Sequence, residues 1–147
     1  MKETRYFYCP DALTCNELPP EEATHAVRVL RLKAGDEIFL INGKGCFFKV
    51  CVSLVTNRRC VYDITEKMPQ EKTWNGSIHL AIAPTKNIDR IEWMSEKITE
   101  IGFDHISFLD CKFSERKQIR IDRIEKIIIS SVKQSRKAFM PKVDGIM

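Results

Sequence analysis

One change of pattern along the chain limits its possible folds more than any other feature. Up to about residue 65, one short helical pattern accompanies several closely spaced strand-like segments, whereas beyond residue 76 strands and long helical patterns alternate. Residues 66–76 between these parts are polar and contain Pro69 and Gly76, as linkers do. The 147 residues suffice for two small domains, which we predict at residues 1–72 and 73–147.

The first part is typical of a small β-barrel with one short helix. Apolar residues at three- and four-residue spacing predict a helix over residues 18–32, with Pro20 at a suitable first-turn position. Three strand-like segments follow, at residues 37–41, 47–55 and 60–65. The pair Asn42-Gly43 between the first two is a strong hairpin signal. Short strands spaced in this way predict a small barrel.

The second part predicts a parallel α/β sheet. Its expected elements are a strand at 78–82, a helix between Asn87 and Gly102, a strand at 105–109 and a helix from residue 121 that Pro141 terminates. The expected apolar face of the first of these helices consists of Ile88, Ile91, Met94, Ile98 and Ile101. Such an order begins a parallel sheet with right-handed crossovers. Parallel sheets are normally buried on both faces, and a sheet of only two strands cannot achieve this. We therefore expect an incomplete domain.

Several classes of site lack their sequence signatures. The turn at residues 83–87 contains no glycine, and the six glycines form neither a dinucleotide fingerprint nor a P-loop, so Lys86 is interpreted as an exposed side chain in preference to a phosphate ligand. No G-x-S-x-G motif is present, and the three histidines are dispersed. The six cysteines form no C-x-x-C pair, so we predict reduced thiols and no metal site.

No apolar run approaches the roughly 20 residues that span a bilayer. The N-terminus has no signal-type stretch either. We therefore expect a soluble, cytoplasmic protein without a membrane partner.

Charge is unevenly distributed. Residues 112–142 contain ten basic and three acidic residues, a net charge of +7, so the remainder carries −3 of the total of +4. A basic segment of this kind is typical of phosphate-backbone binding, but a solvated helix face with pairs such as Asp122–Lys126 gives the same pattern. A second cluster contains Arg28, Arg31 and Lys33, with Arg5 near the N-terminus, and suggests an RNA-binding surface.

Four motifs, in the correct order, resemble those of the RsmE family of bacterial small-subunit rRNA methyltransferases. They are H-A-V-R-V-L-R-L-K-A-G-D at residues 25–36, K-I-T-E-I-G at 97–102, S-E-R at 114–116, and K-Q-S-R-K at 133–137 with Pro141. The resemblance extends from about Arg5 to the C-terminus.

This resemblance implies a PUA-like β-barrel for RNA binding, joined to a SPOUT-type α/β domain that binds S-adenosylmethionine in a C-terminal knot. It further implies a homodimer that transfers a methyl group to N3 of a uridine in 16S rRNA of the small ribosomal subunit. The family's glycine-rich G-P-E-G-G segment has no counterpart here. We therefore expect a SPOUT domain lacking its knot, no cofactor-binding residue in this chain, a cofactor site beyond Met147, and no activity of this chain alone.

The resemblance also suggests site residues, although no catalytic residue is assigned. Candidate RNA contacts are Arg5, Arg28, Arg31 and Lys33, and candidates for the substrate side are Arg116, Gln134 and Arg136. A surface cation or a helix-capping group is an equal alternative for each of them. For the whole chain, the alternative is a stand-alone PUA-like RNA-binding module without catalysis. The missing nucleotide fingerprints disfavour a small-molecule enzyme.

Overall fold

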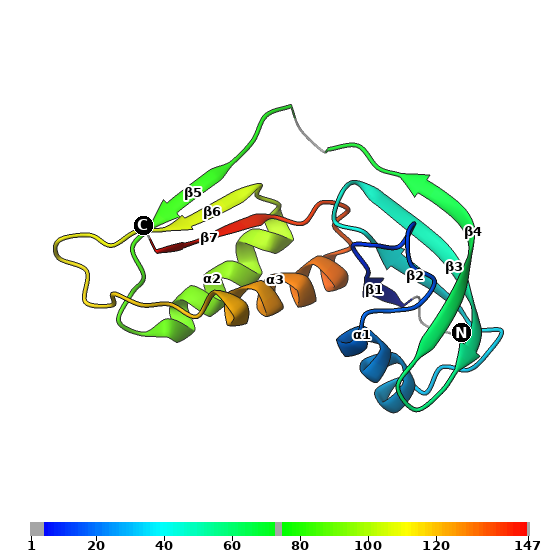
Figure 1. Cartoon of the computed structure of the whole chain (residues 1–147). Helices are drawn as coiled ribbons and strands as arrows, with labels where there is room; N and C mark the ends of the chain where they lie inside the picture. Colours follow the sequence, from blue (N-terminus) through cyan, green and yellow to red (C-terminus); the bar gives the residue numbers. More distant parts are fainter. Residues whose placement is uncertain (1–4, 73–74, 147) are drawn as a thin grey trace. The chain divides into compact units, whose positions relative to one another are not determined.

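The structure is a computed structural model that describes residues 5–72 and 75–146 (Figure 1). The chain divides into two compact units, Met1–Glu71 and Lys72–Met147, called unit 1 and unit 2 below. Residues 66–69, predicted as part of the linker, instead continue the last strand of unit 1. None of the described helices is long and apolar enough to cross a membrane.

Unit 1 contains a four-stranded sheet in the order β1-β2-β3-β4. The strands are β1 (Tyr6–Tyr8), β2 (Glu37–Ile41), β3 (Cys46–Val55) and β4 (Cys60–Pro69). The predicted hairpin β2-β3 is present, and β3 and β4 form a second antiparallel pair. β1 is parallel to β2 and was missed, because three residues give no alternation to detect. Within the described residues no ladder joins β4 to β1, so the predicted small barrel is not confirmed.

Alternation along the strands builds the core of unit 1. Ile38 and Leu40 on β2, with Phe48, Val50 and Val52 on β3, are almost completely buried. They share one face of the sheet because side chains alternate between the two faces of a strand. The helical segment contributes Ala23 and Ala26 to the same core cluster.

The helix predicted over residues 18–32 is shorter and irregular. α1 (Pro20–Thr24) has Pro20 in its first turn, as predicted, and continues into a π-helical turn, η1 (His25–Val29). Arg31 then adopts the left-handed conformation, with φ of 53°, and the amide of Leu32 donates to the carbonyl of Ala26 at 3.0 Å. Apolar residues at three- and four-residue spacing do not distinguish an α-helical turn from a single π turn, and they carry no information on the φ of one residue such as Arg31.

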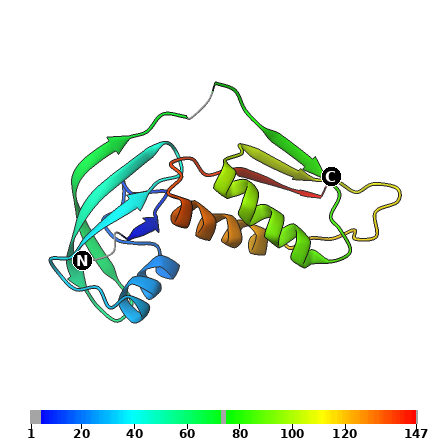
Figure 2. The same ribbon diagram turned by 180° about the vertical axis from the view of Figure 1, so that it is seen from behind.

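Unit 2 is a three-stranded parallel sheet, β5-β6-β7, with two helices on one face (Figures 1 and 2). Its elements are β5 (His79–Ile82), α2 (Ile88–Ile101), β6 (His105–Phe108), α3 (Ile121–Ser135) and β7 (Lys142–Ile146). The predicted order is therefore correct up to α3. β7 was missed because Asp144 and Gly145 interrupt its short apolar pattern.

The predicted boundaries of α2 are correct, but its predicted buried face is only partly so. Asn87 accepts a hydrogen bond from the Asp89 amide, as an N-cap does, and Gly102 follows the last residue. The buried residues are Ile91, Ser95 and Thr99, whereas Ile101 is exposed. The two hydroxyls can be buried because each donates to the carbonyl four residues earlier, at 2.8 and 2.6 Å.

α3 ends earlier than predicted. Arg136 adopts the left-handed conformation directly after Ser135, and the amide of Lys137 donates to the carbonyl of Val132 at 3.0 Å. This cap ends the helix five residues before Pro141, which the sequence had suggested as the terminator.

We expect Arg31→Gly to stabilise unit 1 by about 0.5–1 kcal/mol, because a left-handed residue with a Cβ is strained and glycine is not. Urea unfolding followed by circular dichroism measures the change. The matched control, Arg31→Ala, removes the guanidinium but keeps the Cβ, so it should not stabilise. Equal destabilisation by both substitutions would instead show that the side chain contributes to folding.

Candidate functional site

Two loops of unit 2 meet at the carboxyl edge of its sheet. Residues 83–87 follow β5 and residues 109–120 follow β6. Because β5 and β6 are adjacent and parallel, the segments leaving their carboxyl ends lie at the same edge. This is the edge at which open parallel α/β sheets usually bind ligands.

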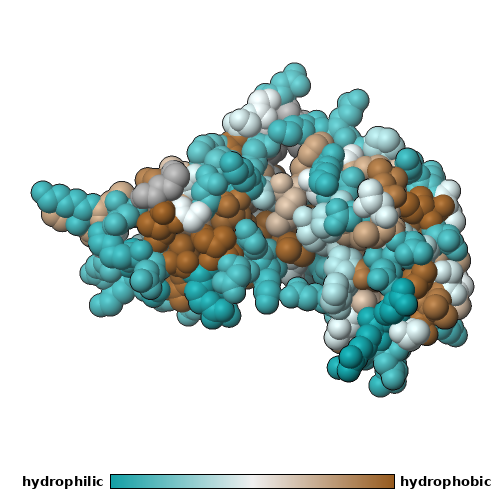
Figure 3. Space-filling model, viewed as in Figure 1, coloured by the Kyte–Doolittle hydropathy of each residue, from teal (hydrophilic) through white to brown (hydrophobic). Residues whose placement is uncertain are grey.

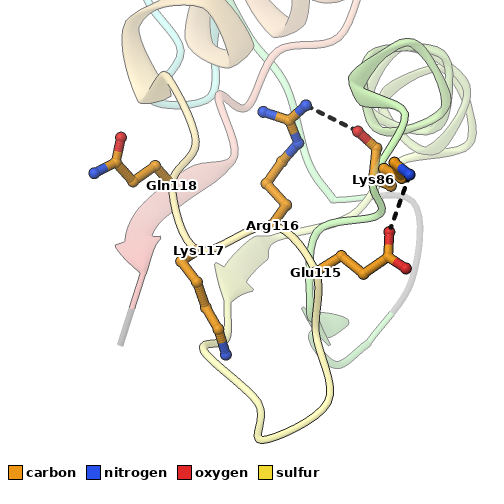
Figure 4. Close-up of a pocket in the computed structure, with 5 residues that line it drawn as sticks. All are labelled: Lys86, Glu115, Arg116, Lys117 and Gln118. Carbon is orange, nitrogen blue, oxygen red and sulfur yellow. Dashed lines mark hydrogen bonds and ion pairs between the residues drawn. The ribbon is translucent and has the colours of Figure 1, made fainter.

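Arg116 ties these two loops together (Figure 4). Its Nε donates to the carbonyl of Thr85 at 3.1 Å, and its Nη2 donates to the carbonyl of Lys86 at 2.8 Å. A guanidinium is planar and rigid, so two such bonds fix both its position and its orientation. Arg116 was predicted on the substrate side; its observed contacts are with the backbone of its own unit.

A cavity of about 360 Å³ lies between the loops, lined by Lys86, Glu115, Arg116, Lys117 and Gln118. The ammonium of Lys117 is turned toward its own loop, where it contacts Asp110 Oδ1 and the carbonyl of Cys111, both at 2.7 Å. Lys86 and Glu115 are 4.0 Å apart at their charged atoms and are largely exposed. The cavity is therefore cationic and open to solvent.

A second tie joins the two helices beside this edge. Arg123 on α3 donates from Nε to both carboxylate oxygens of Glu92 on α2, at 2.9 and 2.8 Å, and its Nη2 lies 2.8 Å from Oε1. These hydrogen bonds hold the pKa of Glu92 below its ordinary value of 4.5, against the opposing effect of desolvation. This pair was not predicted from the sequence.

The other two predicted substrate-side residues lie elsewhere. Gln134 and Arg136 are exposed at the C-terminal end of α3, which leads to the start of β7 and hence to the opposite edge of the sheet. The 15 residues of α3 span about 22 Å. Within one chain, Arg116 therefore lies at the opposite edge of the sheet from Gln134 and Arg136.

In unit 1, three predicted RNA contacts lie on one turn. Arg28 is in the π-helical turn, Arg31 is the left-handed residue, and Lys33 follows it; all three are exposed. Among residues 5–72 and 75–146, no carboxylate forms an ion pair with any of the three. Arg5 differs, because its Nη1 donates to the carbonyl of Leu30 at 3.3 Å and so supports the same turn.

Ion pairs neutralise part of the basic segment at residues 112–142. Lys117 pairs with Asp110, Arg120 with Asp122, Arg123 with Glu92, and Lys142 with Asp144. The predicted partner of Asp122 was Lys126. Arg120 donates to Asp122 at 3.2 Å and lowers its pKa most, and Lys126 lowers the same pKa through charge. The charge sum of the sequence therefore overstates the free positive charge of this segment.

A polar cluster that the sequence analysis missed lies on the strands of unit 2. The rings of His79 and His105 are stacked with centroids 3.8 Å apart, and both contact Ser107 or Asp144. Hydrogen bonds from His105 and Ser107 lower the pKa of Asp144. Recognising β7 would have revealed the cluster, because these residues then occupy alternating positions on three neighbouring strands.

We compared the described residues with the needs of S-adenosylmethionine. That cofactor carries a sulfonium cation, yet the cavity at the carboxyl edge is lined by Lys86, Arg116 and Lys117. The turn at residues 83–87 also has no glycine that would let the backbone approach a nucleoside closely. This edge does not fit the cofactor.

Among the described residues, no group of three or more histidine, cysteine or acidic side chains could hold a metal, and all six cysteines are free.

Comparison with known families agrees with this architecture. The sequence model of the RNA methyltransferase domain matches residues 72–147, and that of the RNA methyltransferase PUA domain matches residues 18–62. The chain therefore belongs to the RNA methyltransferase family, with RsmE-like relatives.

Individual relatives are longer than this chain. It is 25% identical over 129 residues to ribosomal RNA small subunit methyltransferase E of Rickettsia conorii, spanning 87% of this chain but 52% of that protein. A solved "probable rRNA-methyltransferase" from Porphyromonas gingivalis is 40% identical, with a TM-score of 0.89 over 97% of this chain and 59% of that one. The S-adenosylmethionine-bound ribosomal RNA small subunit methyltransferase E of Neisseria gonorrhoeae is 24% identical, with a TM-score of 0.83 over 99% of this chain and 62% of that one. This similarity shows the fold.

We expect Glu92→Gln to destabilise the protein by about 1 kcal/mol at pH 7, because it removes the charged partner of Arg123. Since folding lowers the pKa of Glu92, this stabilisation is present above pH 4.5 and is lost as the pH falls through the folded value. The difference between the two proteins in urea unfolding should therefore disappear in acid. Glu125→Gln, on an exposed carboxylate of α3, is the control; a gap that does not change with pH would contradict the assignment.

Proposed function

We propose that this chain forms the RNA-binding part of an RsmE-type methyltransferase, which transfers a methyl group from S-adenosylmethionine to N3 of a uridine in 16S rRNA of the small ribosomal subunit. In this proposal residues 1–72 are a PUA-like RNA-binding domain, and residues 73–147 are the first part of a SPOUT-type domain.

The turn that carries Arg28, Arg31 and Lys33 is the main support for RNA binding. Three cations that have no carboxylate partner among the described residues are exposed within six positions of the chain. Ion pairing, the usual alternative role of a surface cation, is absent for them within that part of the chain. Cations of this kind can contact phosphates and release the counterions that RNA carries. The segment also lies within the match to the PUA domain.

Backbone strain supports the same assignment. A glycine would adopt the left-handed conformation of residue 31 without cost, yet the sequence has an arginine there. Arg136 has the same φ of 53° at the end of α3. Strained non-glycine residues are concentrated at functional sites, where another requirement offsets their cost. We therefore retain Arg31 as an RNA contact and Gln134 and Arg136 as substrate-side residues, and assign Arg5 to support of the turn.

The methyl donor belongs to the proposal through the family and through the bound relative from Neisseria gonorrhoeae. S-adenosylmethionine supplies an electrophilic methyl group. Because the carboxyl edge of unit 2 does not fit it, we assign no cofactor-binding role to the described residues, and we do not expect this chain alone to methylate RNA. The match of the methyltransferase domain to residues 72–147 disfavours a stand-alone RNA-binding module.

A homodimer and a cytoplasmic location complete the proposal. Trp93 and Ile101 on α2 are 63% and 68% exposed, an unusual state for large apolar side chains on a helix. Hydrophobic side chains also gather over the helices of unit 2 (Figure 3). A second copy could cover this apolar surface.

Charge reversal in unit 1 tests the proposal directly. We expect Arg28→Glu with Arg31→Glu to weaken binding of a single-stranded 16S rRNA fragment at least tenfold, and to reduce the slope of log K against log salt by about 1.4, for two lost phosphate contacts. Fluorescence anisotropy at several salt concentrations measures both.

A matched double variant, Arg58→Glu with Lys67→Glu, changes the charge of unit 1 equally at two other exposed cations. It should weaken binding much less. Equal losses for the two double variants, or an unchanged salt slope, would contradict the proposed RNA surface.

A further inference from the structure

Lys86 stands out among the cations at the carboxyl edge of unit 2 because its charge is poorly neutralised. Its side chain is 86% exposed, and its closest carboxylate, on Glu115, is 4.0 Å away and itself 66% exposed. Ion pairs of this length between exposed groups contribute little. The neighbouring Lys117 is different, since its ammonium is engaged by two acceptors at 2.7 Å. Lys86 therefore retains its donors for a ligand.

Arg116 presents a second, fixed positive charge at the same cavity. Of its five N–H groups, one on Nε and one on Nη2 serve the carbonyls of Thr85 and Lys86. Up to three remain for a ligand. Figure 4 shows the guanidinium lying between Lys86 and the segment that carries Gln118. Because the carbonyl bonds already hold it, a ligand would not have to order this side chain.

We infer that Lys86 and Arg116 bind a backbone phosphate of the RNA. This inference rests on the proposed function, which supplies RNA as the ligand. The cavity of about 360 Å³ is open to solvent, as a site for one link of a passing chain must be. Phosphate oxygens accept hydrogen bonds from both kinds of cation, and arginine suits them especially. The sequence alone does not identify this site, because Lys86 has no glycine-rich phosphate loop around it.

Glu115 competes with a phosphate for the ammonium of Lys86. Without RNA it is the carboxylate nearest to the ammonium of Lys86. A phosphate at Lys86 must therefore displace it, or bind close to a like charge. Removing the charge of Glu115 should strengthen RNA binding, whereas reversing the charge of Lys86 should weaken it. Opposite effects from two neighbouring positions are not expected from general misfolding.

The test uses the whole 147-residue chain and a 15-nucleotide single-stranded RNA, with fluorescence anisotropy at constant salt. We expect Lys86→Glu to weaken binding about three- to tenfold and to lower the salt slope by about 0.7. Glu115→Gln should strengthen binding about twofold. Lys112→Glu is the matched control, because Lys112 is an exposed cation of the loop that carries Arg116 and does not line the cavity. It should change binding less than twofold.

Two results would overturn the inference while leaving the proposed function intact. One is that Lys86→Glu and Lys112→Glu weaken binding equally while the double variant at Arg28 and Arg31 still weakens it strongly. The other is that inorganic phosphate shifts the NMR signals of Lys86 and Arg116 and the RNA neither shifts them nor competes, which would identify a free-anion site. If the unmodified chain binds no RNA, both the proposed function and this inference fail.

Discussion

The paired hydrogen bonds from Arg116 to the carbonyls of Thr85 and Lys86 are the constraint on which the carboxyl edge of unit 2 depends. They join a loop of twelve residues, 109–120, to the short turn at residues 83–87, which the loop also approaches through the long Lys86–Glu115 pair. A lysine at position 116 would keep the charge but could not satisfy both carbonyls in one plane. The position of Lys86, and hence the shape of the cavity, follows from this tie.

The position and ion pairing of each cation indicate function better than the net charge of a segment does. Four cations of the basic segment are paired with carboxylates, whereas Arg28, Arg31 and Lys33 in the less basic part of the sequence have no such partner among the described residues. Two arginines occupy left-handed positions after helical segments, where glycine would be less strained. The strongest indications of function thus come from backbone conformation and from the lack of ion pairs.

Patterning predicted the elements that have strong local signals: the hairpin at Asn42-Gly43, the Asn87 cap and the alternation of strands and helices in unit 2. It failed where local side-chain hydrogen bonds or tertiary contacts decide the outcome. Ser95 and Thr99 are buried because they bond to their own helix, and β7 forms because β6 provides a parallel partner for an interrupted sequence. Resemblance to a family suggested Arg31 and Arg116 as site residues, but it gave neither the strain of the first nor the backbone contacts of the second. Lys86 and the Glu92–Arg123 pair depend on segments about 30 residues apart, so a single sequence could not identify them.

The central claim is that these residues provide RNA-binding parts of a methyltransferase and not the site of its methyl donor. Isothermal titration calorimetry of the 147-residue chain with S-adenosylmethionine tests it most directly. We predict no saturable heat at micromolar concentrations, because the carboxyl edge presents cations to a cationic ligand. Stoichiometric binding with a micromolar dissociation constant would contradict it, and would show that the described residues contain a cofactor site.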